Sequence, residues 1–261
     1  MPTRTRRTSP ARRAALRTPY GVISIVAGLL LWELLVRVFE PNPLVIVAPS
    51  TIAATLWELF RTGSIWPDLI VSMQGFAIGY VLAAVVAIAL GLAIGASTIL
   101  YRWTNPWVNA LYATPIIGLA PLMIIIFGFG LQSKVAVVIA LVIFPILINT
   151  VAGARAVSTD YRELAVVYQA SRFETFTKVL FPGALPFILT GLRLAVGRGL
   201  IGVVVADLFG ASSGLGLNLQ QSAQSFDTPN IFAVTVLLAF LGIVLTGVIE
   251  FFEHRAHRGM K

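Results

Sequence analysis

Long apolar stretches alternate with short polar segments along the whole chain. Six stretches carry few or no charges and are long enough to cross the hydrocarbon core of a bilayer, which takes about 20 helical residues. They are residues 20–39, 69–101, 103–133, 135–154, a fifth between residue 186 and Leu208, and 231–249. This pattern predicts an all-α polytopic membrane protein with six transmembrane helices.

The third apolar stretch contains three prolines. Pro106, Pro115 and Pro121 fall within residues 103–133, and proline removes a helical hydrogen bond and clashes with the preceding turn. This span is therefore predicted to be bent or broken. Irregular backbone at membrane depth is tolerated where it faces protein or a water-filled cavity. Pro115 and Pro121 are accordingly candidates for the wall of a pathway, with purely structural kinks as the alternative.

The segments on the outer side of the predicted spans differ in character. Residues 51–62 have the spacing of an amphipathic helix, which Gly63 is expected to end. Lys134 is placed in the outer turn between the third and fourth spans. Residues 208–230 contain no lysine or arginine and are rich in glycine and glutamine. They predict a loop that dips back or contacts a docking partner.

A polar, charged interruption at residues 163–182 organises the chain. Its pattern predicts a helix, a break, a second helix and a stop at Pro182 and Pro186. Ser171 and Glu174 have the spacing of a capping box, which would start the second helix. The apolar residues that follow at helical spacing are Phe173, Phe176, Val179 and Leu180.

This apolar face lies in a loop, where lipid cannot cover it. A loop that only joined two spans would need about five residues. One interpretation is that a protein partner binds the two phenylalanines. The other is that both rings fold back onto the ends of the chain's own helices. Periodicity alone leaves the two open.

The loop resembles the EAA loop of ABC-importer permeases. Glu163–Ala165 match its E-A-A, Gln169 stands at its glycine, and the closing I-x-L-P is matched by Val179, Phe181 and Pro182. Further segments resemble the nitrate, sulfonate and taurine subgroup of these permeases. They are Pro49-Ser50, Leu56–Leu59, Gly191–Ala195, Asp207–Phe209 and Ser213–Gly216. The resemblance covers residues 20–252.

The resemblance implies a type I ABC-importer permease fold and a set of partners. These are a cytosolic ABC ATPase subunit that binds the ATP, a second permease copy and an extracytoplasmic substrate-binding protein. It implies that the loop at 155–186 couples the permease to the ATPase. The coupling residues would be Glu163, Ala165, Gln169, Ala170, Ser171, Arg172, Phe173, Phe176 and Pro182. Glutamine is penalised in the left-handed conformation of the family glycine. The bend is thus expected to be gentler or made by other residues.

Composition and charge fit a membrane protein. The chain is 57% hydrophobic and 11% charged, against about 25% charged in soluble proteins. A net charge of +8 could suggest nucleic acid, but the basic residues gather in the N-terminal tail and beside the spans. By the positive-inside rule they place both termini in the cytoplasm of a cell (inner) membrane protein. The expected domains are a basic tail at 1–19, the permease domain at 20–252 and a second tail at 253–261.

Catalytic motifs are missing from the sequence. It has no cysteine, its two histidines, His254 and His257, lie in the C-terminal tail, and it lacks a phosphate-binding loop. An enzyme is therefore not expected, nor a cofactor in this chain. Arg198 and Asp207 are further pathway candidates, because ionisable groups in a span usually face water or a partner. The alternative function is a stand-alone secondary transporter that uses them as a coupling pair. The transported substrate is not predicted.

Overall fold

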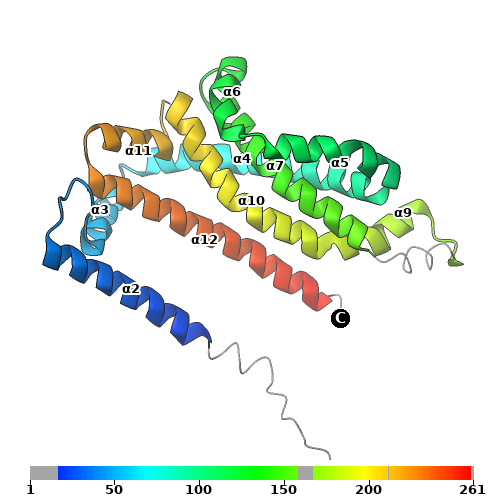
Figure 1. Cartoon of the computed structure of the whole chain (residues 1–261), viewed down its shortest axis with the longest axis horizontal. Coiled ribbons are helices and arrows are strands. Elements are labelled where there is room, and N and C mark those ends of the chain that lie inside the picture. Colours follow the sequence, from blue (N-terminus) through cyan, green and yellow to red (C-terminus); the bar gives the residue numbers. More distant parts are fainter. Residues whose placement is uncertain (1–16, 158–166, 211, 260–261) are drawn as a thin grey trace, which may run out of the picture.

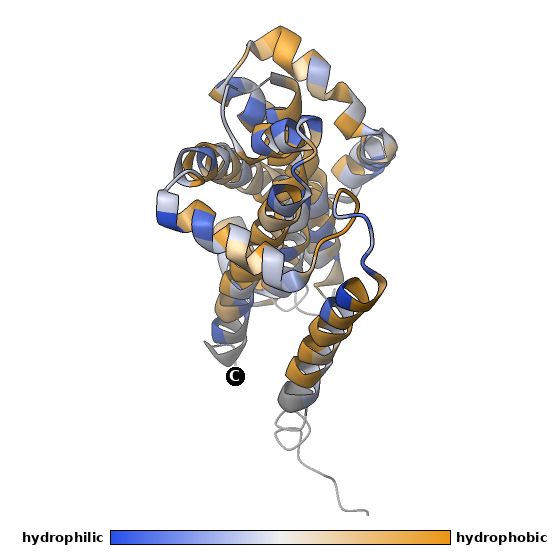
Figure 2. Cartoon of the chain, turned by 90° about the vertical axis from the view of Figure 1, so that its left-hand side faces the viewer, coloured by the Kyte–Doolittle hydropathy of each residue, from blue (hydrophilic) through white to orange (hydrophobic). Residues whose placement is uncertain are grey.

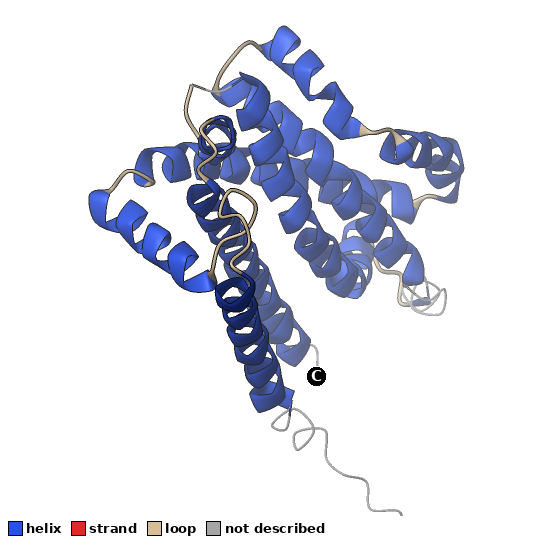
Figure 3. Cartoon of the chain, turned by 60° about the vertical axis from the view of Figure 1, so that its left-hand side comes forward, coloured by secondary structure: helices blue, strands red, loops and turns tan. Residues whose placement is uncertain are grey.

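The computed structural model describes residues 17–157, 167–210 and 212–259, and all regular structure within these ranges is helical (Figure 3). The elements are α2 (Arg17–Phe39), α3 (Pro49–Thr62), α4 (Trp66–Ala96), α5 (Thr98–Ala113), η1 (Ile116–Leu119), α6 (Ala120–Phe127), α7 (Leu131–Ala156), α9 (Arg172–Thr175), η2 (Phe176–Leu180), α10 (Phe181–Gly210), α11 (Leu215–Gln224) and α12 (Thr228–Gly259).

The described residues hold five helices that are long and apolar enough to cross a membrane. They belong to α2, α4, α7, α10 and α12. A sixth span is formed if α5 and the η1–α6 segment count as one, and these two halves meet at a bend of 78°. The prediction of six apolar spans with a broken third one is confirmed. Figure 2 shows hydrophobic residues dominating the long helices, with hydrophilic residues at helix ends and connections.

Helix α7 occupies the centre of the bundle and packs most extensively against α10 and α4 (Figure 1). Glycines on α4 allow the close approach. A Cβ atom at Gly79 would lie 2.7 Å from Val138 Cβ, and one at Gly91 would lie 2.6 Å from Thr150 Cβ. Any larger residue at these positions would push the two helices apart, so the small residues determine this interface.

Helix α2 lies at the edge of the bundle and contacts the rest of the chain mainly through α3 (Figure 1). Glu33 accepts hydrogen bonds from the Ser50 backbone N–H at 3.0 Å and from Ser50 Oγ at 2.8 Å. Its other partner is Arg37 at 2.6 Å, a pairing that the four-residue spacing already suggests. Helix α3 ends as predicted at Gly63, which has a φ of 79°.

The expected stop at Pro182 and Pro186 is wrong. Both prolines lie within α10, which is continuous with the preceding turns. Pro182 falls in the first turn of α10, where a missing N–H is easily tolerated. Just before it, η2 is a π-helical turn in which the Phe181 N–H bonds to the Phe176 carbonyl. This wider turn accommodates the proline without ending the helix.

Lys134 is buried, which corrects its placement in an outer turn. It lies in the first turn of α7 with 2% of its surface exposed, and its Nζ is 2.6 Å from Asp207 Oδ1 on α10. It also donates to the Ser213 carbonyl at 2.8 Å. Gly75 on α4 leaves space for the lysine stem, because a Cβ there would lie 3.2 Å from Lys134 Cβ. The cation is paired inside the protein rather than dissolved in water.

The segment at 208–230, which the sequence predicts on the outer side, begins with the last turn of α10 and folds back over the bundle as α11. Asp207 holds its start: the carboxylate accepts from Ser72 Oγ at 2.6 Å and from the Gly216 N–H at 3.2 Å. Gly214 has a φ of 138°, and a Cβ there would collide with that carboxylate. Asp68 on α4 accepts from the Gly214 N–H at 2.8 Å. Contact of this segment with a docking partner stays a prediction.

Candidate functional site

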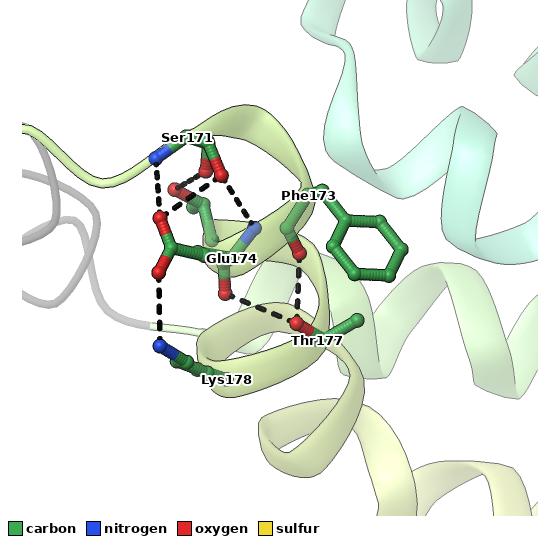
Figure 4. Close-up of polar contacts among 6 residues, drawn as sticks. Ser171, Phe173, Glu174, Thr177 and Lys178 are labelled. Carbon is green, nitrogen blue, oxygen red and sulfur yellow. Dashed lines mark hydrogen bonds and ion pairs between the residues drawn. The ribbon is translucent and has the colours of Figure 1, made fainter.

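The loop singled out in the sequence begins its second helix with the predicted capping box (Figure 4). Glu174 N–H donates to Ser171 Oγ at 3.2 Å, and the Ser171 N–H donates to Glu174 Oε2 at 3.0 Å. Each side chain therefore satisfies a backbone N–H that the first turn would otherwise leave free. Lys178 Nζ lies 3.0 Å from Glu174 Oε1, which ties the box to the next turn.

The apolar face of this helix is divided between the bundle and the surface. Leu180 is buried and packs with Ala154, Ala184 and Ile188. Phe173 is 74% exposed and Phe176 is 39% exposed. In Figure 4 the Phe173 ring points away from the capping residues. Of the two interpretations left open by the sequence, folding back describes the Phe176 ring in part, whereas the Phe173 ring remains largely exposed.

Gln169 adopts the left-handed conformation, with a φ of 55°. The expectation of a gentler bend, or of a bend made by other residues, is wrong, because this residue itself makes the turn that leads to α9. For a non-glycine residue this conformation costs about 1–2 kcal/mol. Val167 and Tyr168, just before it, are also strongly exposed.

The structure describes several of the predicted coupling residues only in part or not at all. Glu163 and Ala165 lie outside the described residues. Arg172 begins α9, but its side chain is likewise outside the description. Ala170 is partly buried, and Pro182 lies in the first turn of α10. Whether these residues transmit a signal stays a prediction.

The pathway candidates of the third span lie at its break. Pro115 separates α5 from η1, and Pro121 lies in the first turn of α6. Both prolines are exposed on the single chain. The break thus forms an irregular surface rather than a buried kink, which is the placement a pathway wall would need.

Arg198 has a partner that the sequence did not reveal. Its Nη2 donates to Tyr112 Oη at 2.7 Å, and its guanidinium carbon lies 5.0 Å from the centre of the Tyr112 ring. Tyr112 comes from the end of α5, 86 residues away along the chain. Arg198 is exposed on the single chain although it lies within an apolar helix. A guanidinium there is expected to face water or protein rather than lipid.

Asp207 and Arg193 also have specific partners. Asp207 is fully buried and paired with Lys134, so the structure does not bring it together with Arg198. Arg193 lies 3.3 Å from Glu250 and 3.7 Å from Glu253 on α12. These ion pairs join α10 to α12.

Comparison with known proteins agrees with this geometry. Residues 83–260 match the family described as "Binding-protein-dependent transport system inner membrane component". The chain belongs to this family. As an inner membrane component it is a multi-pass transport permease and not an enzyme. The ABC-permease resemblance seen in the sequence is thereby confirmed, in preference to a stand-alone secondary transporter.

The names of relatives within this family refer to different substrates. The chain is 30% identical to the aliphatic sulfonates transport permease protein SsuC of Bacillus subtilis, covering 90% of this chain and 85% of the relative. It is 31% identical to the formylaminopyrimidine transport permease protein ThiX of Halalkalibacterium halodurans, covering 87% and 90%. It is 29% identical to the nitrate import permease protein NrtB of Leptolyngbya laminosa, covering 74% and 69%.

Solved structures show the same fold. An amino acid ABC transporter crystallised with histidines aligns with a TM-score of 0.61 at 15% identity, covering 77% of this chain and 97% of that one. The MetNI methionine ABC transporter in an inward-facing conformation aligns with a TM-score of 0.61 at 19% identity, covering 74% and 94%. The helical arrangement is therefore that of a type I ABC-importer permease, as the resemblance implied.

Proposed function

We propose that this permease forms the pathway of an ATP-driven importer for a small nitrate- or sulfonate-like solute, delivered by an external binding protein. The observation that carries the proposal is the capped helix start at Ser171, which presents a 74% exposed Phe173 beyond the end of a span. Large aromatic side chains of this kind are typical anchors in partner pockets. A cytosolic ATPase subunit is the partner proposed for it.

A single helical rod connects this anchor to the rest of the molecule. Helical structure continues from Phe173 to Phe209 over 37 residues, a length of about 55 Å at 1.5 Å per residue. Arg198 lies on this rod, and Asp207 lies near its far end. When the ATPases close on ATP and move the loop, the rod would carry the displacement across the membrane and reorient the cavity.

The proposal includes a second permease copy, because one chain alone leaves a charged side chain and broken backbone uncovered. Arg198 and the prolines of the broken span are exposed on one chain. Lipid is a poor environment for a charged side chain and for broken backbone. A second copy would enclose this surface and leave a water-filled pathway between the two subunits.

Co-purification tests the proposed function against a stand-alone carrier. When the permease is expressed with a candidate ABC ATPase subunit from the same organism and extracted in a mild detergent, we expect both subunits in one complex. Reconstituted uptake should require ATP and the binding protein. Uptake by the permease alone, driven by an ion gradient, would contradict the proposal.

Single cysteines test the orientation, because the chain has no native cysteine. Ser64 and Ser225 are exposed at one end of the bundle, and Thr177 is exposed on the loop helix. Ser64→Cys and Ser225→Cys should react with a membrane-impermeant maleimide in intact cells. Thr177→Cys should react only after the membrane is opened, and labelling of Thr177→Cys in intact cells would reverse the topology.

Arg198→Ala tests the pathway. Loss of a charge-assisted interaction with solute costs about 1.5–3 kcal/mol, or roughly tenfold or more in uptake rate. The complex should still assemble, since Arg198 is exposed and its partner Tyr112 can bind water. Arg102→Ala is the matched control, because Arg102 is exposed on α5 but lies outside this contact. Equal uptake by wild type and Arg198→Ala would leave the residue with a structural role only.

A further inference from the structure

A cavity lies between α4, α5 and the last turns of α7. It has a volume of about 240 Å³. The space is about eight times the ~30 Å³ that one water molecule occupies in the liquid, so a small solute would fit. The lining residues are Ile94, Tyr101, Thr104, Asn105, Val108, Asn109, Ile148, Val151, Ala152 and Arg155.

Arg155 provides the positive charge of this cavity. It lies in the last turn of α7, and its guanidinium carbon is 3.9 Å from the centre of the Tyr101 ring. The tyrosine ring covers one face of the guanidinium group. The N–H groups lie in the guanidinium plane and can therefore still donate hydrogen bonds to an acceptor. Within the described ranges Arg155 has no carboxylate within ion-pair distance.

Two amide side chains face the same space from α5. Asn105 and Asn109 are four residues apart, which places them on one side of the helix. Neither amide has a hydrogen-bond partner among the described residues. The lining contains no aspartate or glutamate. One guanidinium, two amides with free N–H donors and no opposing carboxylate form a set that suits an anion with oxygen acceptors.

We propose that this cavity binds the oxyanion group of a small solute, such as a sulfonate or nitrate, on the cytosolic side. The side is taken from the proposed function, whereas the anion chemistry comes from the lining alone. The site differs from the Arg198 surface. Tyr101 and Tyr112 are eleven residues apart on α5, so the two arginine–tyrosine pairs lie about 16 Å apart along the helix.

The location places the site next to the coupling loop. Arg155 lies in the last turn of α7 and is the first residue of the coupling loop defined at 155–186. The cavity also joins α7, the central helix, to the start of α5. An anion held there would bridge the first half of the broken span, α5, and the central helix α7.

Direct binding tests this proposal. The purified permease–ATPase complex in phosphatidylcholine nanodiscs, without binding protein or ATP, would be titrated with ³⁵S-methanesulfonate, and unlabelled nitrate would serve as competitor. Arg155→Gln should weaken binding about tenfold or more, as expected for loss of a charged hydrogen-bond donor. Asn105→Leu combined with Asn109→Leu should weaken it several-fold. Arg155→Lys should retain part of the affinity, because the positive charge remains.

Arg102→Gln and Arg198→Gln are the controls. Arg102 is the neighbouring exposed arginine of α5 and does not line the cavity, so its variant should bind like wild type. Arg198→Gln should also retain this binding. Equal losses in Arg102→Gln and Arg155→Gln would reveal unspecific attraction and overturn the proposal. Loss of methanesulfonate binding in Arg198→Gln alone would also overturn the proposal. Unchanged binding by Arg155→Gln would overturn it too.

A lipid headgroup phosphate offers the same oxygen acceptors, so the lipid composition is varied. We expect methanesulfonate to bind in phosphatidylcholine nanodiscs and to compete with phosphatidylglycerol when that lipid is added. Retention of phosphatidylglycerol by wild type but not by Arg155→Gln, with no sulfonate binding in either lipid, would assign the cavity to lipid and overturn the proposal. Because ATPase co-purification is measured separately, failure here is distinguishable from failure of the proposed function.

Discussion

Replacing Phe173 and Phe176 together by alanine is expected to detach the ATPase and abolish transport. Both side chains lie on the capped loop helix, with 74% and 39% of their surfaces exposed. Burying one such ring in a partner pocket is worth about 1.5–3 kcal/mol. Because the two rings are only partly exposed, their loss would weaken docking by about 2–3 kcal/mol, or about one to two orders of magnitude in the dissociation constant.

The measurement is co-purification of the ATPase together with ATP hydrolysis stimulated by the loaded binding protein. The variant permease should still insert, because the capping box and the buried Leu180 keep the loop helix in place. Phe129→Ala is a matched control. Phe129 is 82% exposed but precedes α7, far from the loop along the chain. A double variant that retains its ATPase and its stimulated hydrolysis would show that the partner binds elsewhere.

Lys134→Met is expected to produce the largest loss of stability. It removes the partner of Asp207, which is fully buried between α4, α7 and α10. An uncompensated buried charge typically costs about 3–5 kcal/mol. The free energy of unfolding in detergent, measured by denaturant titration, should fall by about that amount.

Two further variants test whether the charge pair is responsible. Lys134→Met combined with Asp207→Asn should recover part of the lost stability, because no charge is left buried while the asparagine oxygen can still accept from Ser72. Glu58→Ala removes the exposed ion pair with Arg61 and should cost no more than about 1 kcal/mol. If the Lys134→Met variant unfolds like the Glu58→Ala variant, the buried pair is not a stabilising element.

The same variants address the remaining prediction about Asp207. A carboxylate that lines the pathway would affect uptake more than stability. A carboxylate that joins the ends of α4, α7 and α10 would affect both together. The buried contacts with Lys134, Ser72 and the Gly216 N–H support the second outcome.

Features that depend on neighbouring residues could be predicted from the sequence. The apolar spans follow from length and composition, the broken third span from its prolines, and the end of α3 from Gly63. The capping box at Ser171 and Glu174 needs only a three-residue spacing. All of these are local interactions, because a helical turn brings residues three or four apart into contact whatever the rest of the chain does.

Tertiary structure decided the features that join distant residues. The Lys134–Asp207 pair comes from two different helices, and Arg198 meets Tyr112 across 86 residues. The left-handed conformation of Gln169 and the continuous helix through Pro182 were likewise not predicted by the local pattern. A buried charge is stable only when groups from elsewhere in the chain compensate the cost of removing it from water. The sequence by itself determined the spans and the loop, whereas packing in three dimensions determined which charges are paired and which remain exposed.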